Sequence, residues 1–78
     1  SWKENKLIFI NMNLEELVKL LERKYGVEIE VDDRSIFNYH YDGTIKNESI
    51  LEVMDLIKIT LPIDYKVIGQ KIHITKKF

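Results

Sequence analysis

The chain contains an internal repeat in which each copy joins a capped amphipathic helix to an alternating strand. The first copy runs from Asn13 to Val31 and the second from Ser49 to Val67, an offset of 49 − 13 = 36 residues without a gap. A repeat of this kind fixes the architecture, and two copies indicate an internal duplication rather than a solenoid. The matching pairs are Leu14 with Ile50, Glu16 with Glu52, Leu17 with Val53, Leu20 with Leu56, Leu21 with Ile57, Gly26 with Pro62, Val27 with Ile63 and Val31 with Val67.

Each copy begins with a residue suited to cap a helix. Asn13 and Ser49 are each followed three residues later by a glutamate, which is the pattern of a capping box. Gly26 is placed to adopt the left-handed conformation that ends the first helix. Leu61-Pro62 ends the second helix, because proline cannot continue one. The apolar stripe of the first helix comprises Leu14, Leu17, Val18, Leu20, Leu21 and Tyr25.

Short apolar or alternating runs around the helices predict strands. Gly69-Gln70 forms a two-residue loop typical of a β-hairpin. Residues 36–39 predict an irregular connection that brings Ile36 or Phe37 into the core. The predicted strands are residues 6–10, which Asn11-Met12-Asn13 ends, and then 27–31, 40–46, 63–67 and 71–75.

This order of elements predicts an α+β fold made of two duplicated β-α-β halves (βαββαβ) plus a C-terminal hairpin strand. Two helices would pack with two small sheets, and a ferredoxin-like sandwich is the alternative from the same order. With 78 residues the chain has room for one core. Residues 1–5 are expected to be a tail from cloning or from an upstream domain, and 6–78 a single domain.

The second helix has apolar residues on the side that should face water. Leu51 and Ile59 are eight residues apart and lie on nearly the same face as Asp55. A helix that is apolar almost all round is usually buried on two sides. The helix therefore lies between two layers, or it carries a contact patch for a partner. The first reading is favoured, because large exposed apolar patches are uncommon on monomers.

Composition and motifs exclude several classes of function. The chain has no cysteine, so thiol catalysis is excluded, and its net charge of −1 provides no field for nucleic acid. No apolar run approaches the roughly 20 residues that span a bilayer. His40 and His73 fall in separate predicted strands without a second ligand at short spacing. No metal, cofactor or catalytic residue is predicted, and we expect the domain not to be an enzyme.

The remaining class of function is recognition of another protein through the surface of the domain. Open sheet edges are templates on which another chain can add a strand. The last predicted strand is expected to be such an edge, and a proline at His73 should then abolish partner binding while leaving the fold mostly intact. The predicted partner-binding residues are Leu51, Ile59, Lys71, His73 and Thr75.

Several short motifs follow one another over almost the whole chain. They are Leu7-Ile8-Phe9, Asn13-Leu14-Glu15-Glu16-Leu17, Leu21-Glu22-Arg23-Lys24-Tyr25-Gly26-Val27, Tyr41-Asp42-Gly43-Thr44-Ile45-Lys46-Asn47-Glu48-Ser49, Leu51-Glu52-Val53-Met54 and Leu61-Pro62-Ile63-Asp64-Tyr65. Together they make the run from Trp2 to Thr75 resemble the C-terminal domain of FecR-family anti-sigma factors, periplasmic regulators common in Bacteroides-type bacteria. The resemblance implies a fold similar to the short N-terminal domain of secretins and TonB-dependent receptors, with two helices between two small sheets.

The resemblance also implies a role in signal transduction and transcription regulation. The parent protein would cross the inner membrane once and hold a sigma factor through a cytoplasmic segment. This domain would lie in the periplasm and receive the signal from the signalling domain of a TonB-dependent outer-membrane transducer. The alternatives are a short N-terminal signalling domain of such a receptor or of a secretin, and a small ligand-binding domain. The resemblance supplies no catalytic residues.

Overall fold

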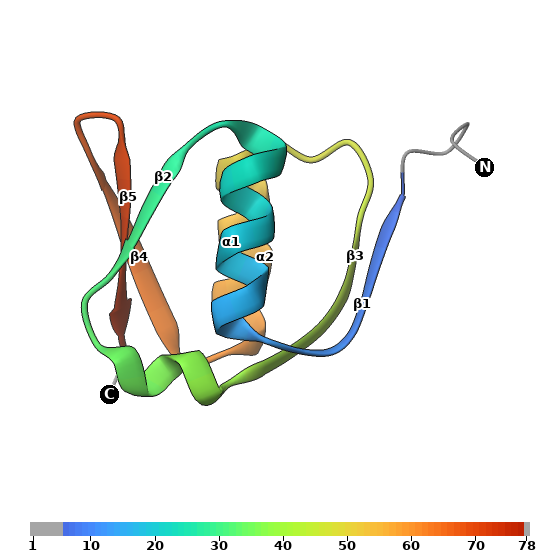
Figure 1. Ribbon diagram of the computed structural model, residues 1–78, viewed down its shortest axis with the longest axis horizontal. Coiled ribbons are helices and arrows are strands. Elements are labelled where there is room, and N and C mark those ends of the chain that lie inside the picture. The colour runs from blue at the N-terminus through green and yellow to red at the C-terminus, as the bar shows by residue number, and fades with distance from the viewer. Residues whose placement is uncertain (1–5, 78) are drawn as a thin grey trace.

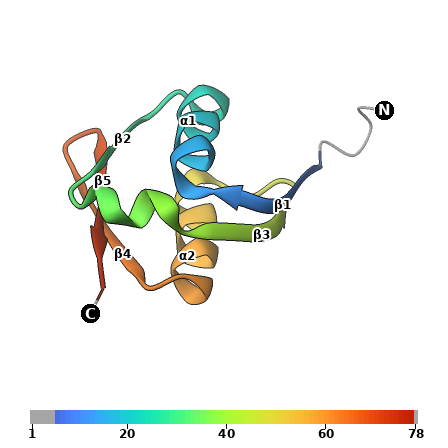
Figure 2. The same ribbon diagram turned by 60° about the horizontal axis from the view of Figure 1, so that its bottom comes forward.

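The computed structural model describes residues 6–77, and the tail expected at residues 1–5 lies outside them. Two helices pack side by side between two small sheets. One helix lies behind the other in Figure 1, and the turned view of Figure 2 separates them. The 3-10 helix η1 lies below them in the view of Figure 1. The elements are β1 (Leu7–Asn13), α1 (Leu14–Tyr25), β2 (Glu28–Val31), η1 (Arg34–Asn38), β3 (His40–Ile45), α2 (Ile50–Thr60), β4 (Ile63–Ile68) and β5 (Lys71–Lys76).

Each sheet takes strands from both β-α-β halves, β1-α1-β2 and β3-α2-β4, each of which contains one copy of the repeat. β1 pairs antiparallel with β3, and the second sheet has the order β2-β5-β4. Each helix packs on the strands that flank it in sequence, whereas those strands find their hydrogen-bonding partners outside their own copy. The predicted α+β fold with two helices and two small sheets is confirmed, and the single sheet of a ferredoxin-like sandwich is not formed.

The last strand is not a sheet edge, so that prediction is wrong. β5 is hydrogen-bonded on both sides, parallel to β2 and antiparallel to β4. His73 lies between Glu30 and Lys66. Alternation reveals which face of a strand is buried, but not which strands lie beside it. A proline at His73 would interrupt a central strand and disrupt the fold itself, because proline cannot donate to the ladder.

The first strand continues beyond Ile10, where it was predicted to end. Between Phe9 and Met12 the register shifts, so that β1 has one extra residue relative to β3. Asn11 has a φ of 53°, a left-handed conformation that asparagine tolerates better than most residues. Its N–H donates to Asp42 Oδ1 over 2.7 Å. The strand therefore passes through a β-bulge and ends at the cap of α1.

The predicted helix ends are confirmed. The Asn13 side chain accepts a bond from Glu16 N at 2.9 Å, but the return bond of a capping box, from Asn13 N to the Glu16 side chain, does not form. At Ser49 both bonds of the capping box form, 3.3 Å from Glu52 N to Ser49 Oγ and 2.8 Å from Ser49 N to Glu52 Oε1. Gly26 has a φ of 65°, as its role at the end of α1 requires.

The core lies between the two sheets and is lined by both helices. Two pairs of repeat-related helix positions are buried alike: Leu17 and Val53 are fully buried, and Leu21 and Ile57 are each 1% exposed. Ile36 of the 3-10 helix also enters the core, as predicted. The remaining buried residues are Phe9, Leu14, Val18, Tyr41, Ile45, Met54, Ile63, Ile72 and Ile74.

Candidate protein-interaction surfaces

The outer face of α2 exposes three large apolar side chains, which we call the α2 patch. Leu51 is 43% exposed, Leu56 40% and Ile59 80%. The helix does lie between two sheets, and its inner face is buried in the core. Yet the expectation that this position would also bury Leu51 and Ile59 is wrong, because the sheets leave the outer face of the helix uncovered.

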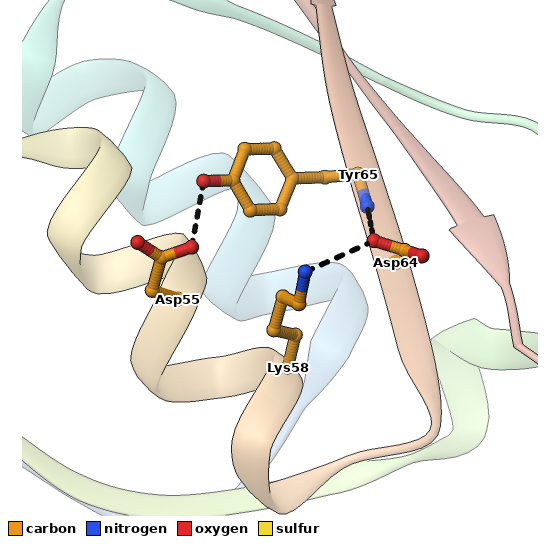
Figure 3. A network of polar contacts seen from close by, with 4 residues as sticks. All are labelled: Asp55, Lys58, Asp64 and Tyr65. Carbon is orange, nitrogen blue, oxygen red and sulfur yellow. Dashed lines mark hydrogen bonds and ion pairs between the residues drawn. The ribbon is translucent and has the colours of Figure 1, made fainter.

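Polar contacts tie the patch helix to β4 (Figure 3). The Tyr65 hydroxyl donates to Asp55 Oδ1 at 2.7 Å, and this bond, together with burial, raises the pKa of the phenol. The Lys58 ammonium lies 3.3 Å from Asp64 Oδ1 and 5.5 Å from the centre of the Tyr65 ring. The Tyr65 backbone N–H and then Lys58 lower the pKa of Asp64. Asp55 lies between Leu51 and Ile59 in the helix, so these contacts anchor the middle of the patch.

A groove at the C-terminal end of α2 adjoins the patch. Its volume is about 430 Å³, and its lining combines apolar side chains with two lysines. An apolar segment that carries a carboxylate would suit such a lining. The residues are Lys58, Ile59, Thr60, Leu61, Pro62 and Lys77.

The other three predicted site residues lie on a different surface. Lys71, His73 and Thr75 are half-buried on β5, on the opposite side of the strand from Ile72 and Ile74, which point into the core. Glu30 of β2 engages two of them, with its Oε1 3.5 Å from Lys71 Nζ and 3.8 Å from His73 Nδ1. The five predicted residues therefore divide between a helix and a charged sheet face.

Sequence reasoning missed two further apolar sites. Ile8 and Ile10 on β1 are 62% and 79% exposed, and Val67 and Ile68 beside the hairpin loop are 48% and 53% exposed. The β1 pair has a sequence signal, because the uninterrupted apolar run from Leu7 to Ile10 leaves apolar side chains on both faces of a strand.

No constellation for chemistry appears within residues 6–77. No polar or charged side chain there is buried, and no group of three histidine or acidic residues could hold a metal ion. His40 lies on β3 and His73 on β5, in different sheets. In the same part of the chain, no helix has the length and apolarity that a bilayer crossing requires.

The partly buried tyrosine at the end of α1 joins the two β-α-β halves. The Tyr25 hydroxyl donates to the Glu48 carbonyl oxygen over 2.8 Å. Burial first, and then the carboxylates of Glu48 and Glu52, raise the pKa of Tyr25. This bond holds the loop before α2 against the end of α1, and so supports the start of the patch helix.

The chain is similar in sequence and in fold to known proteins. Residues 6–74 match the family model described as FecR, C-terminal. Two crystal structures, at 1.65 and 2.50 Å resolution, of a protein from Parabacteroides distasonis ATCC 8503 assigned as an anti-sigma factor share the fold. Each has a TM-score of 0.87 and 26% identity over 99% of this chain.

The present chain spans 36% of the length of those solved chains. No curated protein matches it. The family model covers nearly all of the described residues, from the start of β1 to Ile74 in β5. The chain therefore belongs to the family of FecR C-terminal domains.

Proposed function

We propose that residues 6–78 form a periplasmic signalling domain of an anti-sigma regulator, which binds the signalling domain of a TonB-dependent outer-membrane transducer. The parent protein would cross the inner membrane once and hold its sigma factor on the cytoplasmic side. Membership of the FecR C-terminal family is the observation that carries this proposal. The similarity to a solved protein assigned as an anti-sigma factor supports the regulatory role.

The α2 patch is the partner surface that we propose. Leu51, Leu56 and Ile59 lie on one helix, and apolar anchors on a helix are a common means of protein recognition. The bonds from Asp55 and Lys58 to β4 fix this helix before binding, which lowers the entropy cost of forming a complex. Lys71, His73 and Thr75 remain proposed contacts through the charged face of the β2-β5-β4 sheet.

The experiment titrates the domain with signalling domains of TonB-dependent transducers from the same genome, and isothermal titration calorimetry measures the affinity. Ile59→Glu should weaken binding tenfold or more, or about 1.4 kcal/mol, because a buried carboxylate would lose its hydration in the contact. Ile10→Glu is the matched control, since Ile10 is 79% exposed and Ile59 80%.

The outcomes separate the parts of the proposal. If no transducer signalling domain binds, the proposed partner is wrong. If binding occurs and Ile59→Glu leaves the affinity unchanged, the partner stands but the α2 patch is not its contact. A loss on Ile10→Glu alone would move the contact to the β1–β3 sheet.

A further inference from the structure

An N–H group on the outward-facing side of β2 is hydrogen-bonded to a side chain from α1. A strand at the edge of a sheet turns alternate N–H groups away from its partner. The Ile29 N–H, at the middle of β2, does not donate to β5 but to Glu22 Oε2 at 2.9 Å. The Glu22 main chain is held in the same place, because its carbonyl oxygen accepts from Gly26 N and Val27 N at 2.9 and 3.3 Å. A half-buried carboxylate therefore fills the position that the carbonyl group of an added strand would take.

The other edge of this sheet, at β4, is occupied in a similar way. Ile68 and Lys71 are paired beside the two-residue hairpin loop, so that alternation turns Tyr65 N–H away from β5. This N–H donates to Asp64 Oδ1 at 2.9 Å, and Lys58 of α2 holds the same oxygen at 3.3 Å (Figure 3). The next outward N–H, of Ile63, donates to the Leu61 carbonyl oxygen at 2.8 Å.

The two arrangements occupy equivalent places in the repeat. Ile29 and Tyr65 are separated by 65 − 29 = 36 residues, and Glu22 and Lys58 by 58 − 22 = 36 residues. In both copies the same strand N–H bonds to a carboxylate, and the same helix position provides or holds it. Glu22 acts directly, whereas Lys58 acts through Asp64.

We infer that Glu22 and Asp64 each occupy an outward N–H on one outer edge of the β2-β5-β4 sheet, and so hinder strand addition by a second copy of the chain. An edge strand with free N–H groups is a template for pairing, and charged side chains placed on edges prevent it. A second copy would have to displace each carboxylate from its N–H. Pairing of β2 with another β2 would also bring the exposed Glu28 and Glu30 of two chains together. This inference does not depend on the proposed function.

The test removes both carboxylates and measures self-association. The double variant Glu22→Ala/Asp64→Ala is compared with Glu15→Ala/Glu16→Ala, which also loses two negative charges but leaves both sheet edges unchanged. The Glu15 carboxylate lies 4.0 Å from Lys19 Nζ, and Glu16 is exposed on α1. Sedimentation velocity over a range of concentrations gives the apparent mass. For Glu22→Ala/Asp64→Ala this mass should increase with concentration from the wild-type value toward twice that value. The chain mass is 9.3 kDa. The control should remain at the wild-type mass, and amide signals of β2 and β4 should broaden only in the first variant.

A further variant separates hydrogen bonding from charge. Glu22→Gln/Asp64→Asn retains an oxygen that accepts the N–H bond, so it should remain at the wild-type mass despite its lost charges. The inference is overturned if the alanine variant associates no more than wild type, or if both alanine variants associate equally.

If the alanine variant does not fold, amide hydrogen exchange in the wild-type protein tests whether the two carboxylates bind these N–H groups. The Ile29 and Tyr65 amides should exchange many-fold more slowly than the Gln70 amide of the hairpin loop. Equal exchange rates would show that the carboxylates do not occupy these N–H groups, and would overturn the inference.

Discussion

Truncating repeat-related core residues should destabilise the domain equally and unfold both sheets together. Leu21 of α1 and Ile57 of α2 are equivalent in the repeat and are each 1% exposed. Each helix contacts one strand of each sheet, and each sheet needs strands from both β-α-β halves. A cavity beside either helix therefore weakens the same cooperative unit, whichever copy it lies in.

The size of the effect follows from the atoms removed. Leucine and isoleucine each lose three carbon atoms on replacement by alanine, or about 2.4 kcal/mol at about 0.8 kcal/mol for each buried group. The cavity that remains adds to this, so about 3 kcal/mol is expected for Leu21→Ala and for Ile57→Ala. A domain of this size has about 4–12 kcal/mol of stability, so either change removes a large part of it. Leu56→Ala is the control, because Leu56 is 40% exposed and should lose less than about 1 kcal/mol.

Urea unfolding followed by circular dichroism and by amide resonances from each sheet measures the effect. Both core variants should shift the midpoint to a similar degree, and the two sheets should unfold at one midpoint. The reasoning is refuted if Leu21→Ala melts β1 and β2 while β3 and β4 remain protected. If the losses in free energy of unfolding of the two core variants differ by more than about 2 kcal/mol, the two sites are not equivalent.

Two further predictions concern the helix caps and acid stability. Ser49→Ala should lower the free energy of unfolding by about 1 kcal/mol, and Ser49→Asp should restore it; a urea midpoint that does not move would contradict the role of the cap. The pKa of Asp64, ordinarily 3.8, is lowered in the fold by the Tyr65 N–H and by Lys58. Its contribution to stability is therefore complete above pH 3.8 and is lost as the pH falls through the lower folded value. The urea midpoint should fall less steeply below pH 3.8 in Asp64→Asn than in wild type, and equal slopes would contradict the assignment.

The helices and their ends could be predicted because their determinants are local. Asn13, Ser49, Gly26 and Pro62 each act on backbone groups within a few residues, and the 36-residue offset relates the two copies directly. The hairpin at Gly69-Gln70 is also local, and the structure forms it with β4 and β5 on either side.

Strand neighbours could not be predicted, because they are decided by contacts distant in sequence. The bulge at Asn11 depends on Asp42, which lies 31 residues away. β5 was expected at an edge because its hairpin with β4 explains only one of its two sides, whereas β2 pairs with the other. The same limit applies to the surface: the pattern identified Leu51 and Ile59 as unusual, but whether another layer would cover them depended on where the sheets lie.

The central position of β5 affects how the protein forms during synthesis. β2 and β4 belong to one sheet but do not pair with each other, since Lys71–Lys76 lies between them. On the ribosome, β2 would emerge about 40 residues before β5, the strand with which it pairs, and would wait about 2 to 8 s for it at typical elongation rates. During that interval the Glu22 carboxylate on α1 is already able to engage the Ile29 N–H, only seven residues away. A contact that closes an edge in the finished fold can thus also guard a nascent strand until its partner has been made.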